Sequence, residues 1–574
     1  MTPTPERKLP GTVDYFVIAA TAVLVYANSL QGELVYDDHQ AIVANPDVTG
    51  KAASLSTLLQ HDFWGAPLSH AGSHKSWRPL TTLTFRINYL LHRLSTFGFH
   101  YVNVMLHAVC SCLVHKLAER FIKGRGPRLF ASLLFAVHPI HCEAVSSIVG
   151  RADLLSSLFV LLGLVLDDQG ENLILTASLS SMALLSKETG ISLLPLIVSH
   201  RLLSRRIKKI SSIVPHLSIL FFLSILRLSM NGFSSPSFSS SDNPISRHPS
   251  LAVRSMTFLT LPVLHLKMLV WPQILSFDWS MDAVPPVTTP IDSRLLSSVA
   301  VYGILALITM VCLRQLNVAP QISSPKMKAK DLNVSMQLLK ALLILCLPHV
   351  LLSSNLLVYV GFVLAERILY LPSVGFCLMV GMAADVLMKR RKLSSTIAIC
   401  LGSLVLSLMA FRTVARNEEW SDELKLFQSA IHVNPPKALA NAGHVLARRG
   451  RRDEAAQAYL DALQHRPTMA DTHYNLGTLH SESGNHSVAV DFYRNAIKLR
   501  PNFAAAHLNL GISLKILGRR EEALVVFKRC SQLDGSGSKT INSHIKAQAD
   551  CAYSGGSMLA DLGEHNGAVR AFRQ

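Results

Sequence analysis

Several motifs that would identify a soluble enzyme are absent from this sequence of 574 residues. It contains no Walker, G-x-G-x-x-G or G-x-S-x-G motif, so no pattern indicates a nucleotide-binding loop or a serine nucleophile. It also lacks the H-E-x-x-H spacing of a zinc protease. The 9 cysteines are irregularly spaced, lie mostly inside apolar runs and form no C-x-x-C pair. This pattern predicts neither a disulfide scaffold nor a zinc site.

Charged residues are scarce as well. They make up only 16% of the chain, whereas a typical soluble domain has about 25%. Hydrophobic residues make up 49%, so much of the chain needs lipid as its solvent, which excludes a cytosolic single-domain enzyme. The net charge of +18 comes from short basic clusters between apolar runs. Such clusters are typical of membrane loops, and we expect no nucleic-acid partner.

Two regions follow one another along the chain. Apolar runs alternate with short polar loops over residues 15–411, and no comparable run follows. We therefore predict an all-α protein, with a multi-spanning membrane domain at residues 1–411 and a soluble region at residues 412–574.

The soluble region repeats with a period of 34 residues. Its columns of identical or similar residues are Gly443, Gly477 and Gly511; Gly450, Gly484 and Gly518; Ala455, Ala489 and Ala523; and Tyr459, Tyr493 and Phe527. This is the tetratricopeptide pattern, in which small residues lie where two antiparallel helices touch. We predict about three full repeats and a partial fourth. Because no polar capping helix follows, we expect a fragment or a truncated chain. The pairing of Cys530 with Cys551 is left open.

Basic loops predict the topology of the membrane domain. Positive charge concentrates on the cytoplasmic side, so the basic clusters at 7–8, 116–128, 201–209, 314–340 and 389–392 should share one face. The predicted apolar segments are 14–31, 100–118, 129–137, 154–166, 173–186, 191–203, 210–228, 251–271, 295–313, 339–352, 373–388 and 393–411. All five basic clusters can lie on the cytoplasmic side only if one of these segments does not cross the membrane.

The segment that fits this requirement is 251–271, because it contains Arg254, His265 and Lys267, which are costly against lipid. We expect it to lie in the non-cytoplasmic leaflet, which leaves about 11 crossings. An odd number places the repeats opposite the N-terminus, in the lumen of the endoplasmic reticulum. The sequon at Asn485 is then luminal, and the one at Asn333 is cytoplasmic.

The predicted luminal loops contain the unusual polar clusters. Asp37 and Asp38 follow the first apolar segment. Adjacent carboxylates repel, and a raised pKa suits one of them to accept a proton. The alternative is a solvated loop with a helix cap. The same dipeptide at Asp167 and Asp168 falls on the predicted cytoplasmic side, and we assign it no role.

A second cluster runs from His138 to Asp153. His138, His141 and Glu143 could ligate a metal, but the spacing matches no known zinc motif, and capping of the loop is the alternative. We therefore predict no metal. Arg151 is better explained as a partner for an anion, because a guanidinium presents a fork of donors that fits phosphate oxygens.

Two further charged pairs, Lys187-Glu188 and Glu366-Arg367, lie in later luminal loops. Either pair could be a structural ion pair. Together with Arg151 and the aspartates, they suggest a site for a phosphate-linked lipid whose head group lies at the interface. The cations would hold the phosphate as leaving group, while a carboxylate takes a proton from the acceptor hydroxyl.

These motifs, in this order and followed by the repeats, resemble the transmembrane and tetratricopeptide repeat-containing protein family. The strings that carry the resemblance are Val35-Tyr36-Asp37-Asp38, Asn45-Pro46-Asp47, Trp77-Arg78-Pro79-Leu80, His138-Pro139-Ile140-His141, Gly150-Arg151-Ala152-Asp153, Ser186-Lys187-Glu188-Thr189-Gly190, Leu275-Ser276-Phe277-Asp278-Trp279 and Glu366-Arg367-Ile368-Leu369-Tyr370-Leu371-Pro372-Ser373. The resemblance covers nearly the whole chain.

The resemblance implies a C-type glycosyltransferase fold in the membrane of the endoplasmic reticulum. It further implies inverting transfer of mannose from dolichyl phosphate mannose to Ser or Thr of proteins such as cadherins, without a metal or another cofactor. The acidic pair of the family matches Asp37, the expected base, and Asp38, its support. We assign the donor phosphate to Arg151, Lys187 and Arg367 from their charge. Supporting roles are expected for His138, His141, Glu143, Asp153, Glu188 and Glu366.

Two other functions fit the same organisation. In a non-enzymatic membrane adaptor, the repeats would bind a luminal partner and the polar loops would have no catalytic role. A transporter should carry ionisable residues near the middle of the bilayer, whereas here they lie mainly at the ends of the apolar segments.

Overall fold

The chain is described by a computed structural model that covers residues 11–573, apart from 51–53, 71, 168–171, 206–208, 235–241, 319–324, 353–354, 356–358, 391–393 and 536–540. Asp168 of the second aspartate pair lies outside the described residues. The chain divides into two compact units, Met1–Leu68 with His74–Lys425 and Ser69–Ser73 with Leu426–Gln574. We name the first the membrane unit and the second the repeat unit.

The division falls later than the boundary predicted at residue 411. Helix α16 (Ser395–Glu419) continues past the last apolar residues without a break. Its final turns carry Thr413, Arg416 and Asn417, all three completely buried. Because these polar side chains are covered by the membrane unit, they belong to it and not to the soluble region.

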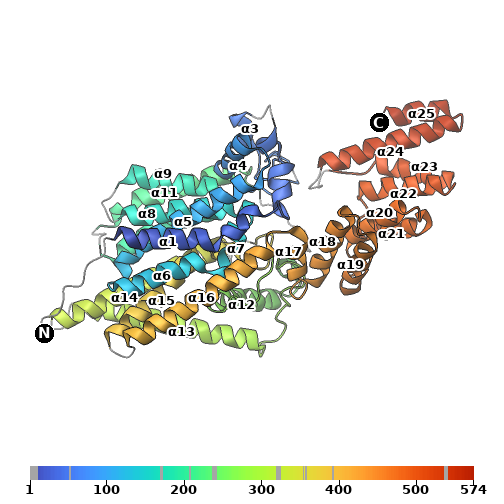
Figure 1. Cartoon of the computed structure of the whole chain (residues 1–574). Coiled ribbons are helices and arrows are strands. Elements are labelled where there is room, and N and C mark those ends of the chain that lie inside the picture. The colour runs from blue at the N-terminus through green and yellow to red at the C-terminus, as the bar shows by residue number, and fades with distance from the viewer. Residues whose placement is uncertain are drawn as a thin grey trace. The chain divides into compact units, whose positions relative to one another are not determined.

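Every one of the twelve predicted apolar segments corresponds to a helix (Figure 1). Besides α16, these are α1 (Thr12–Val25), α5 (Thr96–Phe121), α6 (Arg125–Val137), α8 (Arg151–Leu166), α9 (Leu173–Ser186), α10 (Leu193–Leu203), α11 (Val214–Met230), α12 (Leu251–Val270), α13 (Ser293–Val318), α14 (Pro325–Leu352) and α15 (Pro372–Lys389). In the described part of the chain, 7 helices are long and apolar enough to cross a membrane. The count of eleven crossings stays a prediction.

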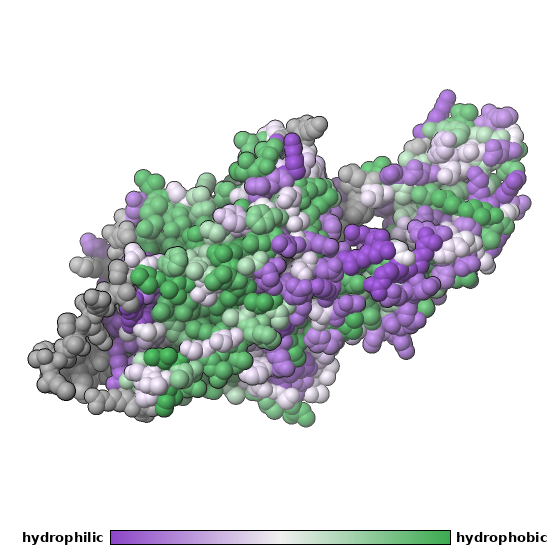
Figure 2. Space-filling model, in the orientation of Figure 1, coloured by the Kyte–Doolittle hydropathy of each residue, from purple (hydrophilic) through white to green (hydrophobic). Residues whose placement is uncertain are grey.

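The helices of the membrane unit differ in how much protein surrounds them. Of the apolar stretch within Ile148–Leu166, which includes α8, 83% is buried, against 6% of the stretch within Ser395–Glu419. Hydrophobic side chains cover the visible face of the unit over α1, α5 and α6 (Figure 2). Helix α8 is therefore a core helix whose polar residues face protein, whereas α16 presents side chains such as Leu404 and Leu408 outward.

Helix α12, which we predict to lie in one leaflet, packs against loops. Phe258, Leu261 and Leu269 belong to one buried cluster with Ile140 and Ile368, which lie in connections between helices. Helix α12 also packs against α13, where the hydroxyl of Tyr302 donates a hydrogen bond to the carbonyl of Leu259 at 2.7 Å. Its length still suffices for a crossing, and the leaflet placement stays a prediction.

Within its described residues, the repeat unit contains four antiparallel helix pairs. They are α18 (Pro435–Arg448) with α19 (Arg452–His465), α20 (Ala470–Glu482) with α21 (His486–Leu499), α22 (Ala504–Ile516) with α23 (Arg520–Ser531), and α24 (Ile541–Asp561) with α25 (His565–Phe572). A Cβ atom at Gly477 would lie 2.7 Å from the ring of Tyr493, so the helices pack this closely only around glycine. Gly484 has φ +79° in the turn between them, a conformation that favours glycine. Close packing on an aromatic ring thus explains the glycine column that contains Gly477, and a positive φ explains the column that contains Gly484.

The open question about the cysteines is answered in this unit. Cys530 of α23 and Cys551 of α24 form a disulfide, with their Cα atoms 6.0 Å apart. Disulfides are typical of proteins in oxidising compartments.

Candidate functional site

The first predicted cluster begins with a buried carboxylate. Asp38 is completely buried, and its two oxygens accept hydrogen bonds from the backbone N–H groups of Val149 (2.9 Å) and Val35 (3.2 Å). Burial raises the pKa of Asp38 to about 7, and the neighbouring Asp37 acts in the same direction. Asp38 therefore fixes the loop from inside, and its supporting role in catalysis stays a prediction. Asp37 is the carboxylate of the pair that is partly exposed.

Asp37 meets an arginine from a distant part of the chain. Oδ2 of Asp37 lies 3.7 Å from Nη1 of Arg367, and both side chains are 26% exposed. On its other side, Nε of Arg367 lies 3.4 Å from Oε1 of Glu143. Burial alone would lower the pKa of Arg367, but Glu143 and Asp37 outweigh it and raise the pKa above its usual value. The cation is thus held between two carboxylates at a solvent-accessible position.

Glu143 also holds the backbone beside this arginine. Its Oε2 accepts the N–H groups of Glu366 (3.0 Å) and Arg367 (2.8 Å), where the η10 turn (Arg367–Leu369) begins. Burial raises the pKa of Glu143. One carboxylate therefore both orients the Arg367 side chain and anchors the turn that carries it.

Glu366 connects the same turn to two other segments. Its Oε1 accepts hydrogen bonds from the N–H of Ser276 (2.5 Å) and the indole of Trp279 (3.2 Å), and its Oε2 lies 3.8 Å from Nη2 of Arg416 on α16. Burial raises the pKa of Glu366 to about 7, although Arg416 opposes the shift. This side chain is completely buried, so it holds together the segments around the turn that carries Arg367.

Lys187 and Asp153 form a second buried pair, with 2.6 Å between Nζ and the carboxylate. Burial lowers the pKa of Lys187, and Asp153 opposes this. Arg367 is within electrostatic range of both residues. The pair therefore lies beside the Asp37–Arg367–Glu143 cluster.

Glu188 is shared by two arginines, with Arg78 and Arg227 both 2.9 Å away. Burial alone would raise the pKa of Glu188, but these arginines outweigh it and lower the pKa to about 2. Lys187 is also within electrostatic range of Arg78. The charged residues of four predicted luminal loops thus meet at one end of the helices.

The assignment of Arg151 to the donor phosphate is wrong for this geometry. The side chain is completely buried, and it donates hydrogen bonds to the side chain of Asn103 (2.8 Å) and the carbonyl of Phe99 (2.9 Å). The guanidinium also lies 4.8 Å from the centre of the Phe85 ring. Arg151 and Asp153 are two residues apart on α8 and so face different sides. Arg151 holds helices together instead of facing the charged cluster.

The two histidines are structural as well. His138 is completely buried, bonds the carbonyl of Leu269 (2.9 Å) and accepts the N–H of Ile140 (3.2 Å). His141 is also completely buried and bonds the hydroxyl of Ser373 at 2.8 Å. His138 therefore caps the loop, as the alternative interpretation predicts. None of these contacts brings either ring to the Asp37–Arg367 pair.

Some contributors were not singled out from the sequence. Arg227 lies at the end of an apolar segment, and Arg416 lies beyond the predicted domain boundary, so the sequence pattern indicates neither as a site residue. Arg78 and Asp278 stand in the strings that carry the family resemblance, and that is the signal that could have found them. Asp278 accepts a hydrogen bond from the hydroxyl of Tyr36 at 3.4 Å.

A multi-spanning helical unit with an acid–arginine cluster at the ends of its helices, joined to tetratricopeptide repeats, defines the class of this protein. Residues 232–306 match the family described as Protein O-mannosyl-transferase TMTC, DUF1736, and residues 438–471 and 470–503 match tetratricopeptide repeats. The first match includes Ser276 and Trp279, which bond Glu366.

Relatives extend the match over nearly the whole chain. Protein O-mannosyl-transferase Tmtc1 of Drosophila melanogaster is 41% identical over 97% of this chain and 74% of that protein. Protein O-mannosyl-transferase TMTC2 of Homo sapiens is 36% identical over 97% of this chain and 75% of that protein. Among solved structures, the crystal structure of MamA is 20% identical, with a TM-score of 0.23 over 26% of this chain and 83% of that one. The chain belongs to the TMTC family of protein O-mannosyl-transferases and is a membrane-bound glycosyltransferase.

Proposed function

We propose that the chain transfers mannose from dolichyl phosphate mannose to Ser or Thr hydroxyls of secretory-pathway proteins, and that Asp37 is the base. The observation that carries this proposal is the approach of Asp37 to Arg367 at 3.7 Å in a position open to solvent. A carboxylate and a cation beside one another supply the two functions that glycosyl transfer from a phosphate needs.

Asp37 accepts the proton of the acceptor hydroxyl while the oxygen of that hydroxyl forms a bond to C1 of mannose. The bond from C1 to the phosphate oxygen breaks with inversion, and dolichyl phosphate leaves with the electron pair. Arg367 stabilises the negative charge that develops on the leaving phosphate, because its fork of donors fits phosphate oxygens. No residue needs to form a covalent intermediate.

The donor also prepares the base. In the protein alone, Arg367 interacts with both Asp37 and Glu143. A donor phosphate attracts the same guanidinium and so weakens its hold on Asp37. Because a nearby cation favours the charged form of a carboxylate, Asp37 then becomes a stronger base. Lys187 lies beside Arg367 in a buried ion pair with Asp153 that neutralises its charge, so Arg367 is the cation that we assign to the phosphate.

The repeats present protein acceptors, among which extracellular cadherin domains are the candidates that the family implies. We place the repeat unit in the lumen of the endoplasmic reticulum, and the Cys530–Cys551 disulfide supports this placement. The sequon at Asn485 tests it, because this residue is exposed in the turn before α21. A glycan on Asn485 that endoglycosidase H removes supports the lumen. A glycan on Asn333 instead would overturn the topology.

The catalytic assignment is tested with Asp37→Asn in vesicles that contain the purified chain, radiolabelled dolichyl phosphate mannose and a cadherin domain. General-base catalysis contributes about a hundredfold or more, so incorporation of mannose should fall by about this factor. Asp292→Asn is the matched control, since it removes a carboxylate that also pairs with an arginine, Arg294, at 2.8 Å.

Unchanged incorporation in Asp37→Asn, with normal folding, would remove Asp37 from the mechanism. The non-enzymatic adaptor would be the better interpretation if the wild-type chain bound acceptor proteins through its repeats but incorporated no mannose into any of them.

A further inference from the structure

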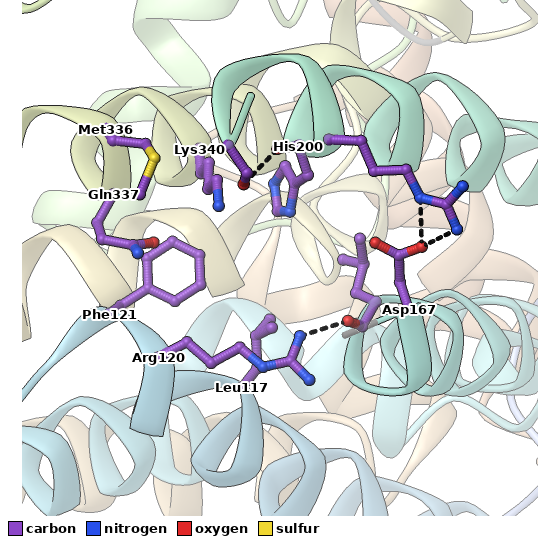
Figure 3. A pocket seen from close by; sticks show the side chains of 11 residues that line it. Leu117, Arg120, Phe121, Asp167, His200, Met336, Gln337 and Lys340 are labelled. Atoms are coloured by element: carbon purple, nitrogen blue, oxygen red, sulfur yellow. Dashed lines mark hydrogen bonds and ion pairs between the residues drawn. The ribbon is translucent and has the colours of Figure 1, made fainter. Parts of the chain in front are cut away.

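A second charged site lies at the other end of the membrane unit. A cavity of about 270 Å³ opens between α5, α8, α10 and α14 (Figure 3). Leu164 lines it, whereas Asp153 of the same helix belongs to the cluster described above. These residues are separated by about 16 Å along α8, from the rise of a helix. The cavity is therefore distinct from the proposed catalytic site.

Positive charge predominates among the described residues that line this cavity. Arg120, Arg201 and Lys340 are cationic, and Asp167 is the one carboxylate among them. Figure 3 shows the Lys340 ammonium, the Arg120 guanidinium and the ring of His200 around the same space. A cavity with this excess of positive charge attracts an anion.

Two of the cations are fixed by the fold. Arg120 donates a hydrogen bond to the carbonyl of Leu164 at 2.6 Å, at the C-terminal end of α8. Arg201 donates from Nε to Asp167 at 2.8 Å, and its side chain is 8% exposed. The positively charged wall is therefore preformed, and a ligand does not need to order it.

Three separate basic segments of the sequence meet here. Arg120 comes from the cluster at 116–128, Arg201 from the cluster at 201–209, and Lys340 from the cluster at 314–340. Basic loops gather on the cytoplasmic side of a membrane. The cytoplasmic leaflet contains the anionic lipids, and basic pockets between membrane helices on that side bind their head groups.

We propose that this cavity binds the phosphate head group of an anionic phospholipid from the cytoplasmic leaflet. Its size suits a head group and not a whole lipid, since pockets for drug-sized ligands begin at about 300 Å³. Leu117, Phe121 and Met336 provide apolar contacts in the same wall, where the glycerol and the first acyl carbons would lie. Phosphate oxygens accept hydrogen bonds from Lys340, while Arg120 and Arg201 contribute positive charge to the surrounding wall.

The test measures lipid binding by native mass spectrometry of the delipidated full chain in detergent. Phosphatidic acid should bind more tightly than phosphatidylcholine with the same acyl chains. Lys340→Gln should weaken phosphatidic acid binding by about fivefold, the effect of one cation near an anionic head group, and Lys340→Arg should restore it. Lys116→Gln is the matched control, because this lysine lies on α5 near the cavity but is 49% exposed and pairs with Glu119.

Equal binding of the two lipids, or an unchanged affinity in Lys340→Gln, would overturn the proposal. An equal loss in Lys116→Gln would also overturn it, because it would show attraction to a basic surface without a defined site. Displacement of phosphatidic acid by millimolar inorganic phosphate would assign the cavity to a soluble anion instead of a lipid. The measurement needs no mannose transfer, so it is independent of the proposed function.

Discussion

Two arginines that the sequence suggests for the same task lie in opposite surroundings. Arg367 faces the carboxylates of Asp37 and Glu143 and keeps 26% of its side chain exposed. Arg151 is completely buried and donates to neutral oxygens, including those of Asn103 and Phe99. An arginine beside carboxylates and solvent can exchange one anion for another, whereas an arginine enclosed by neutral acceptors is committed to the fold.

The largest effect on the rate should come from Arg367→Gln. In the proposed mechanism the leaving phosphate loses its main stabilisation without this cation, and we expect the rate of mannose transfer to fall about a hundredfold. The thermal unfolding temperature should fall less than in Arg151→Gln, because Glu143 keeps its hydrogen bonds to two backbone N–H groups. Arg294→Gln, which breaks the ion pair with Asp292 elsewhere, should leave the rate unchanged. Full activity in Arg367→Gln would show that Arg367 does not take part in mannose transfer and so does not differ from Arg151 in this respect.

Arg151→Gln should show the opposite behaviour. Several charge-assisted hydrogen bonds are lost and their buried acceptors are left without donors, so we expect a loss of about 4 kcal/mol in the free energy of unfolding. The rate per folded molecule should stay near that of the wild type. The measurements are chemical unfolding in detergent and transfer normalised to folded protein. A stable variant without activity would return Arg151 to the donor site.

Conservative substitutions should sharpen the difference. Arg367→Lys keeps the positive charge beside the leaving phosphate but loses the fork of donors, so we expect the rate to fall about tenfold, less than in Arg367→Gln. A lysine cannot reproduce the several directed bonds of Arg151, and Arg151→Lys should still cost about 2 kcal/mol of stability. Equal tolerance at both positions would contradict this reasoning.

The smallest effect concerns pH and the surroundings of Arg367. Burial raises the pKa of Glu366 from 4.5 to about 7, so the folded protein retains a proton that the unfolded chain has lost. The contribution of Glu366 to stability therefore falls as pH rises from about 4.5 through 7, by about 1 kcal/mol between pH 6 and 8. Unfolding of wild type and Glu366→Gln across this range should show that the variant gains relative stability. If the unfolding free energies of wild type and Glu366→Gln change with pH in parallel, Glu366 is not the group that titrates in this range.

The sequence predicts the helices and the repeats because both depend on local patterns. Apolar segments must form helices in lipid, and the glycine and aromatic columns record contacts within one repeat. The disulfide was not predictable, because pairing depends on how α23 and α24 pack.

The site is predictable only in part. Charge and loop position bring Asp37, Lys187 and Arg367 to one end of the helices, but they do not distinguish Arg151, whose role depends on which side of α8 it faces. Hydropathy falls before α16 ends, so the sequence assigns Arg416 to the soluble region. Its burial against Glu366 is a tertiary contact that no local pattern records.

In the repeat unit each aromatic ring packs on the glycine of its own helix pair, as Tyr493 does on Gly477. A gene can therefore add or remove one such unit at a time without redesigning its neighbours. Glu366, by contrast, connects its own turn to the segment of Ser276 and Trp279 and to Arg416 of α16, so a change in one of these three segments affects the other two.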